Sequence, residues 1–188
     1  MILSDKSIKE EIQKGNILIE PYHPECIQPS SIDVHLDSKF LVFNKAQHAL
    51  INVKEKQEGL MQKAESTEKE PFILHPGEFV LGSTVERVKM PNNIAGRIEG
   101  KSSLGRLGLL IHSTAGYIDA GWDGNLTLEL SNVSPLPITL YPNMKIGQIS
   151  FIRMTTEVEK PYGTNSIKSK YQGQTGPQES RYYLNFHK

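Results

Sequence analysis

The chain has 188 residues, of which 37% are hydrophobic and 22% are charged, a composition typical of a globular protein with one core of ordinary size. Its 21 basic and 21 acidic residues balance, so no net field attracts nucleic acid or an anionic membrane. A single cysteine, Cys26, excludes an internal disulfide and the cysteine set of a structural zinc site. With no apolar run suited to a signal peptide or a membrane span, we expect a cytoplasmic protein.

The first predicted element is a short helix near the N-terminus. Ser4 is a suitable N-cap, Ile8 and Ile12 share one helical face, and Gly15 is a suitable C-terminal stop. Residues 30–43 alternate apolar and polar side chains and predict a strand. Residues 54–71 are rich in charge, and we expect them to form a solvated excursion.

Short strand-like runs follow between residues 72 and 154, separated by Gly, Pro and Asn turns. Such spacing predicts an all-β sandwich or barrel rather than β-α-β units. From about residue 160 the chain is polar and poor in aliphatic side chains. We expect this tail to stay mobile or to become ordered on a ligand or a neighbouring subunit.

Residues 99–108 are the strongest candidate for binding an anion. Lys101 and Arg106 bracket Ser102 and Ser103, and three glycines allow close approach of the backbone. Hydroxyls, backbone amides and two cations suit a phosphate chain, although the spacing is not that of a P-loop. The alternative is a β-turn with a solvated basic rim.

Asp119 lies between two apolar residues in a glycine-flanked turn. Its carboxylate could bind a sugar hydroxyl, orient a metal-bound water or act as a base. Capping of the turn through backbone N–H groups is the alternative that local evidence favours.

Glu129 lies in the middle of a predicted strand, where glutamate is uncommon. Strand alternation places it on one face with Thr127, opposite Leu126, Leu128 and Leu130. If that face is solvated, Glu129 is a surface charge. If it lines a pocket, Glu129 becomes a usable general acid or base with the Thr127 hydroxyl in reach of the same ligand.

Together these segments resemble the dCTP deaminases of the dUTPase-like superfamily. The resemblance runs through residues 99–132 and 136–151, and extends to 28–37, 75–84 and 169–177. It implies an all-β fold with minor helices, a distorted β-barrel of the β-clip type that forms a homotrimer with active sites at subunit interfaces. Residues 1–188 would then form one domain, with 160–188 as a tail that closes over the nucleotide.

The resemblance also implies roles for particular residues. Glu129 corresponds to the catalytic proton donor and acceptor, assisted by Ser102, Arg106 and Asp119. The residues that it implies contact the substrate are Lys101, Ser102, Ser103, Leu104, Gly105, Arg106, Asp119, Thr127, Leu128, Glu129, Gln148, Tyr162, Lys170 and Gln174. Zinc-dependent deaminases need a His/Cys/Cys or Cys₃ set, which a chain with one cysteine cannot supply, so we expect no zinc.

Gly116 and Tyr117 bear on the product. Strictly dUTP-forming members of the Gram-negative type carry His-Arg here, whereas Gly followed by an aromatic residue resembles the bifunctional, dUMP-forming subgroup. The implied reaction converts dCTP and two waters to dUMP, diphosphate and ammonia, with Mg²⁺ bound through the phosphates and dTTP as a candidate feedback inhibitor. The alternatives are a monofunctional deaminase that releases dUTP and, less favoured, a plain dUTPase or a non-catalytic nucleotide-binding module.

Overall fold

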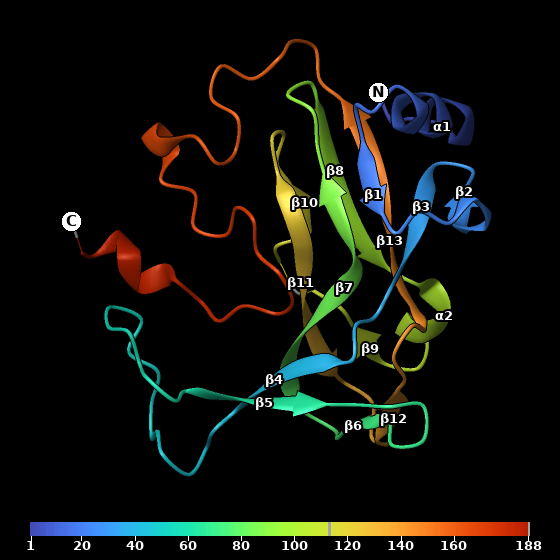
Figure 1. Cartoon of the computed structure of the whole chain (residues 1–188). Helices are drawn as coiled ribbons and strands as arrows, with labels where there is room; N and C mark the ends of the chain where they lie inside the picture. Colours follow the sequence, from blue (N-terminus) through green and yellow to red (C-terminus); the bar gives the residue numbers. More distant parts are fainter. Residues whose placement is uncertain (113, 188) are drawn as a thin grey trace.

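The computed structural model describes residues 1–112 and 114–187, and β-strands dominate it (Figure 1). The strands are β1 (Leu18–Glu20), β2 (Ile27–Gln28), β3 (Ser31–His35), β4 (Lys39–Phe43), β5 (Met61–Glu65), β6 (Phe72–Leu74), β7 (Phe79–Lys89), β8 (Ile94–Gly100), β9 (Leu109–Leu110), β10 (Tyr117–Ile118), β11 (Asp123–Asn132), β12 (Ile138–Leu140) and β13 (Lys145–Arg153). The helical elements are α1 (Asp5–Gln13), α2 (Ser102–Gly105) and the 3-10 helices η1 (Pro24–Cys26), η2 (Asn165–Ile167) and η3 (Tyr182–Asn185). The predicted strand-rich fold with minor helices is confirmed.

The strands form two main sheets and a two-stranded ribbon. One sheet has the order β5-β4-β7-β11-β9, with β1 also paired to β7, and the other has the order β10-β8-β13-β3-β2. Strands β6 and β12 form the ribbon. Between β3 and β4 the chain passes from one sheet to the other and makes an isolated bridge, Leu36–Thr84, rather than a ladder. The expected barrel is therefore corrected: the described strands form sheets that are not closed into a barrel.

The hydrophobic core lies where the two sheets pack together. Leu128 and Leu130 of β11 and Ile149 and Phe151 of β13 are fully buried in one cluster. In β11 the buried residues alternate with half-buried ones along the whole strand, as expected when one sheet face packs on a core. The polar face of β11 is therefore turned away from this core.

Helix α1 forms as the sequence predicts. The Ser4 side chain accepts a hydrogen bond from the Ser7 amide at 3.4 Å, Ile8 is fully buried, and Gly15 follows the helix with a φ of 73°. Glycine adopts this left-handed conformation without steric cost. This helix has nine residues, and within residues 1–112 and 114–187 no helix is long and apolar enough to cross a membrane.

Glu11 links α1 to β13 through a side-chain contact that the hydrophobic periodicity of the sequence does not predict. Its Oε1 accepts a hydrogen bond from Arg153 Nη2 at 2.8 Å, and its Oε2 accepts one from Asn16 Nδ2 at 2.7 Å. The Asn16 hydrogen bond is the main cause that lowers the pKa of Glu11 below its ordinary value of 4.5, and Arg153 adds to the effect. The charged form is thus favoured in the folded protein.

We expect Glu11 to make the stability of the protein depend on pH. Because the folded-state pKa is lowered, the stabilisation is present above about pH 4.5 and is lost as the pH falls through the folded-state pKa. Glu11→Gln should lower the free energy of unfolding by about 2 kcal/mol at pH 7, the net value of a hydrogen bond to a charged group, because the Glu11 carboxylate is buried. Urea unfolding at pH 7 and pH 3 measures this, and the difference should shrink at pH 3. Glu10→Gln on the same helix is the control, and an equal loss at both pH values would contradict the account.

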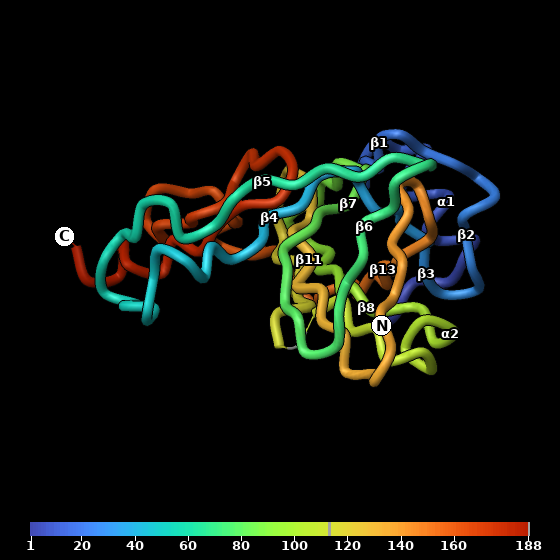
Figure 2. Tube along the Cα trace, turned by 90° about the horizontal axis from the view of Figure 1, so that it is seen from below, coloured from blue at the N-terminus to red at the C-terminus, as the bar shows by residue number. Residues whose placement is uncertain are grey.

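The excursion expected to be solvated, residues 54–71, contains a strand, and the tail contacts its own chain. Residues 61–65 form β5, which pairs with β4 because Met61 is buried in a small apolar cluster while its neighbours remain exposed. Residues 44–60 and the tail lie side by side and project from the body (Figures 1 and 2), joined by a hydrogen bond from His187 Nε2 to the Lys54 carbonyl at 2.9 Å. The charged excursion therefore packs against the tail of its own chain.

Candidate functional site

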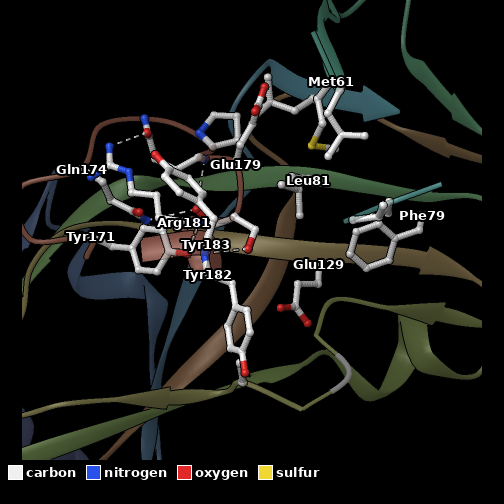
Figure 3. A pocket seen from close by; sticks show the side chains of 18 of the residues that line it. Met61, Phe79, Leu81, Glu129, Tyr171, Gln174, Glu179, Arg181, Tyr182 and Tyr183 are labelled. Atoms are coloured by element: carbon white, nitrogen blue, oxygen red, sulfur yellow. Dashed lines mark hydrogen bonds between the residues drawn. The ribbon is translucent and has the colours of Figure 1, made fainter. Parts of the chain in front are cut away.

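A cavity of about 850 Å³ lies between strands β7 and β11, residues 51–63 and the tail (Figure 3). Phe79 and Leu81 of β7 line it, together with Thr127 and Glu129 of β11. The tail supplies Tyr171, Gln174, Pro177, Gln178, Glu179, Ser180, Arg181, Tyr182 and Tyr183. This combination of apolar walls and a few polar groups is typical of a small-molecule site.

Glu129 projects into this cavity, and that position decides between the two alternatives for its face of the strand. Leu128 and Leu130 on either side of it are fully buried in the core, whereas Glu129 is half-buried and lines the cavity. Its amide donates to the Ile111 carbonyl at 2.8 Å, which fixes the strand at this point. Figure 3 shows its carboxylate directed into the space between Tyr182 and Phe79. The face lines a pocket.

The tail reaches the cavity by adding to the edge of β11. The Gly173 amide donates to the Asp123 carbonyl at 2.8 Å, and the Asn125 amide donates to the Gln174 carbonyl at 3.1 Å. The Gln174 amide group, on a buried side chain, donates to the Asn125 carbonyl at 2.7 Å and to Thr127 Oγ1 at 3.1 Å. The tail therefore becomes ordered on its own chain, next to Glu129.

Gly124 makes this contact possible, and its replacement should release the tail. Its φ is 150°, and a Cβ there would lie 2.9 Å from the Gln174 carbonyl oxygen, so Gly124→Ala combines backbone strain with a clash. We expect the tail to be cleaved at least about tenfold faster by trypsin, because local opening exposes the backbone. Mass spectrometry of timed digests locates the cleavage. Gly100→Ala, where a Cβ would make an ordinary 3.6 Å contact, is the control, and equal digestion of both variants would contradict this reading.

Asp119 and Tyr162 lie around a second, smaller cavity of about 170 Å³. The ring of Tyr162 lies tilted against that of Trp122, with ring centroids 5.3 Å apart. The Tyr162 hydroxyl accepts a hydrogen bond from the Tyr171 amide at 3.2 Å. Burial raises the pKa of the Tyr162 hydroxyl, and the nearby charge of Asp119 adds a smaller rise. Tyr117 lines both cavities, so the two sites adjoin.

Gly116 occupies a position that only glycine fits. It is buried, and a Cβ there would lie 2.8 Å from the Ile98 carbonyl oxygen and 3.0 Å from His112 Cε1. The Gly116 carbonyl also accepts a hydrogen bond from the Ile98 amide at 2.8 Å. Strand β8 and the His112 ring therefore define the space at this residue.

The predicted phosphate segment forms the single turn α2 and lies far from the tail. Ser102, Ser103, Gly105 and Arg106 are exposed, whereas Leu104 packs against the core. Figures 1 and 2 both show α2 on the opposite side of the molecule from the C-terminal tail. Exposed hydroxyls and a guanidinium on a short turn are donors that suit the binding of an anion.

Other predicted contacts are distributed unevenly. Gln148 lies opposite Asp33 and Glu99 in the ladders of β13, on the side of the molecule that carries Lys101. Lys170 contacts Arg181, whose Nη1 donates to the Lys170 carbonyl at 2.6 Å. The side chain of Leu128 is fully buried in the core, and the residue lies opposite Gly82 in the ladder with β7.

Most of the predicted site residues fall into three groups in one chain. Thr127, Glu129, Gln174 and Tyr117 line the larger cavity. Asp119 and Tyr162 line the smaller one. The turn α2 carries a third group on the side of the molecule opposite the tail, and Gln148 lies across the ladder from Glu99, just before that turn. A single chain does not bring the three groups into one site.

Sequence reasoning missed several residues of the larger cavity. Arg181, Tyr182 and Tyr183 line it from the end of the tail, where composition alone indicates solvated side chains. His112 also lines it, with Nε2 at 3.5 Å from Glu99 Oε2 and a buried Nδ1 that has no hydrogen-bond partner among the described residues. The final eight residues include three aromatic ones, Tyr182, Tyr183 and Phe186. This aromatic content was the signal that the end of the tail could pack against the rest of the chain.

The fold and the cavity define a small-molecule-binding β protein with a carboxylate in its site. The family model described as dCTP deaminase-like matches residues 2–154. The chain therefore belongs to the dCTP deaminase-like family.

Individual relatives are similar over nearly the whole chain. A protein of Mycolicibacterium vanbaalenii named "dCTP deaminase, dUMP-forming" is 56% identical over 99% of this chain and 98% of its own length. A protein of Corynebacterium diphtheriae with the same name is 57% identical over 99% of this chain and 100% of its own length. The solved 2'-deoxycytidine 5'-triphosphate deaminase of Agrobacterium tumefaciens matches with a TM-score of 0.62 at 22% identity, over 80% of this chain and 47% of that chain, and supports a shared fold.

Proposed function

We propose that the protein is a dUMP-forming dCTP deaminase, which converts dCTP and two waters to dUMP, diphosphate and ammonia. The observation that carries the proposal is the Glu129 carboxylate inside a cavity, in a chain 56% identical over 99% of its length to a relative named for that reaction. The strand-end glycine at position 116, which the sequence resemblance links to dUMP formation, supports the choice of product. A cytoplasmic setting follows from action on the free nucleotide pool.

Glu129 would carry the deamination. Attack of water on C4 of cytosine needs a base to accept the water proton and an acid to protonate the ring nitrogen and the departing ammonia. One carboxylate can perform these steps in turn, since each transfer returns it to the state that the next step requires. Thr127, which accepts hydrogen bonds from Gln174 Nε2 at 3.1 Å and from the Gln178 amide at 3.3 Å, would place the pyrimidine beside it. Ser102 and Arg106 would position the attacking water and favour the ionised carboxylate.

Assembly as a homotrimer would unite the three groups of site residues. Ser102 and Arg106 are exposed on the side of the fold opposite the tail, so a neighbouring subunit can receive them. In this arrangement the turn α2 of one subunit holds the triphosphate of a nucleotide whose base lies in the cavity of another. Asp119 and Tyr162, which adjoin that cavity through Tyr117, would contact the deoxyribose.

The residues of the phosphate segment fit a triphosphate that carries Mg²⁺. Their hydroxyl, amide and guanidinium groups are mainly hydrogen-bond donors, which suits phosphate oxygens rather than a metal ion. When bound, Mg²⁺ would reduce the charge of the triphosphate. The chain's own part is to orient the phosphates with Ser102, Ser103 and Arg106. We propose that the deamination uses no zinc, because Cys26 is the single cysteine. We also propose that dTTP inhibits the enzyme by competing for the same cavity.

Incubation with dCTP and Mg²⁺, followed by ion-exchange separation of the nucleotides, tests the proposal. We expect dUMP and diphosphate to form together with one equivalent of ammonia. Accumulation of dUTP would instead support the monofunctional alternative. Conversion of added dUTP without conversion of dCTP would identify a plain dUTPase, and unchanged dCTP would refute the deaminase assignment.

A further inference from the structure

A polar face shared by β3 and β13 lies next to the predicted phosphate segment. Asp33 on β3 is 3% exposed, and its Oδ1 accepts a hydrogen bond from Lys101 Nζ at 2.6 Å. Its Oδ2 lies 3.2 Å from Lys145 Nζ and accepts a hydrogen bond from Gln28 Nε2 at 3.3 Å. One buried carboxylate therefore holds two ammonium groups, one on each oxygen.

An irregularity in β13 directs Lys145 to this carboxylate. In the β13–β3 ladder, Gly147 lies opposite Val34. The next pair is Lys145 and His35, so Ile146 is an extra residue on β13. In a regular ladder Lys145 would point to the opposite face of the sheet. The bulge turns its side chain onto the face that carries the buried carboxylate, as bulges beside functional sites often do.

The charges of this cluster leave it able to bind an anion. Two ammonium groups face one carboxylate, so the three groups carry one net positive charge. The side chains of Lys101 and Lys145 are 26% and 44% exposed, and each ammonium has three N–H donors, so both retain donors that can reach a ligand. The hydrogen bond to Asp33 also raises the pKa of Lys145, which keeps its charge.

The cluster also adjoins a residue already assigned to the nucleotide. Gln148 lies directly opposite Asp33 across the ladder, and its Oε1 accepts a hydrogen bond from Ser31 Oγ at 3.3 Å. That bond leaves the Gln148 NH₂ group on the same face as the two lysines. The polar face is therefore continuous with the segment that begins at Lys101.

We propose that Lys145 is a further phosphate-binding residue and that Asp33 positions it together with Lys101. The inference rests on the proposed function for its ligand, the triphosphate of the nucleotide. Lys145 would donate to a phosphate oxygen, while Asp33 would act through the two lysines without touching the substrate.

Binding of inorganic triphosphate, measured by calorimetry on the full chain, tests the proposal without any turnover. Lys145→Gln should bind about 5- to 20-fold more weakly, as expected for loss of one charge-assisted hydrogen bond at a partly exposed site. Lys145→Arg should restore most of the affinity. Lys69→Gln, at an exposed lysine of the excursion, is the matched control and should bind as the unmodified protein does.

Asp33→Asn tests whether Asp33 positions the two lysines or only offsets their charge, because the two roles change the affinity for triphosphate in opposite directions. Removing a negative charge would strengthen anion binding if Asp33 only offset the lysines. We expect binding about 5-fold weaker instead, because the two ammonium groups lose their shared anchor. Thermal melting confirms that each variant is folded, and with dCTP as substrate Lys145→Gln should raise KM with little change in kcat.

Unchanged triphosphate affinity in Lys145→Gln, or tighter binding in Asp33→Asn, would overturn the proposal, as would failure of the unmodified protein to bind triphosphate. Triphosphate binding that depends on Lys145 in a protein that leaves dCTP unchanged would support the phosphate site and refute the proposed reaction. The two failures are therefore distinguishable.

Discussion

Glu129→Gln should lower the rate of ammonia release from dCTP by about a thousandfold, while the affinity for dCTP changes little. The amide has the shape of the carboxylate but cannot accept the proton of water, and general acid–base catalysis typically contributes a factor of about 10²–10⁴. Because Glu129 lies in the cavity with the neighbouring leucines buried behind it, the substitution leaves the strand and its packing in place. A coupled ammonia assay gives the rate, and calorimetry with dCTP gives the affinity.

Glu179→Gln is the matched control, because Glu179 is a second glutamate that lines the same cavity, from the exposed tail. It should keep nearly the full rate. Equal activity of Glu129→Gln and the unmodified protein would refute the assigned role, and equal losses in both variants would show that the cavity needs negative charge rather than a particular acid or base.

Mixing two inactive variants should restore activity if subunits share the site. Glu129→Gln lacks the base, and Arg106→Ala lacks the guanidinium, yet the two residues lie in groups that one chain keeps apart. In a trimer formed at random from equal amounts, a site with intact Glu129 from one subunit and intact Arg106 from its neighbour arises about once in four. We therefore expect about a quarter of the unmodified activity after the variants are unfolded and refolded together.

A chain that carries both substitutions provides the control for this experiment. Mixed with either single variant it offers no complete pair, so it should restore nothing. If Glu129→Gln and Arg106→Ala together also stay inactive, although the two chains are found in the same oligomers, each chain must hold its own complete site and the interface arrangement is wrong.

Periodicity predicted β11 and helix α1 well because both depend on local features. The alternation of Leu126, Leu128 and Leu130 defines the buried face of β11, and Ser4 with Gly15 defines the ends of the helix. These patterns need no knowledge of distant residues. The same alternation placed Glu129 on the face that lines the cavity.

Long-range contacts were the part that local pattern could not supply. The tail looked unable to pack because it has few aliphatic residues, but it adds to β11 through backbone hydrogen bonds, for which side-chain hydrophobicity is irrelevant. Asp33 and Lys101 are 68 residues apart in sequence, and the bulge that redirects Lys145 is a property of strand pairing. Only the fold brings such groups together.

The tight fit of Gly116 limits how this position can change during evolution. Any side chain introduced there meets the Ile98 carbonyl oxygen at 2.8 Å and the imidazole of His112 at about 3 Å, and a backbone carbonyl cannot be trimmed by mutation. A lineage that exchanged this glycine for a larger residue would first have to move β8 or replace the histidine. Exchange of this glycine therefore requires coupled substitutions. Under the role in product choice proposed for Gly116, a switch between dUMP and dUTP in one mutational step should be rare.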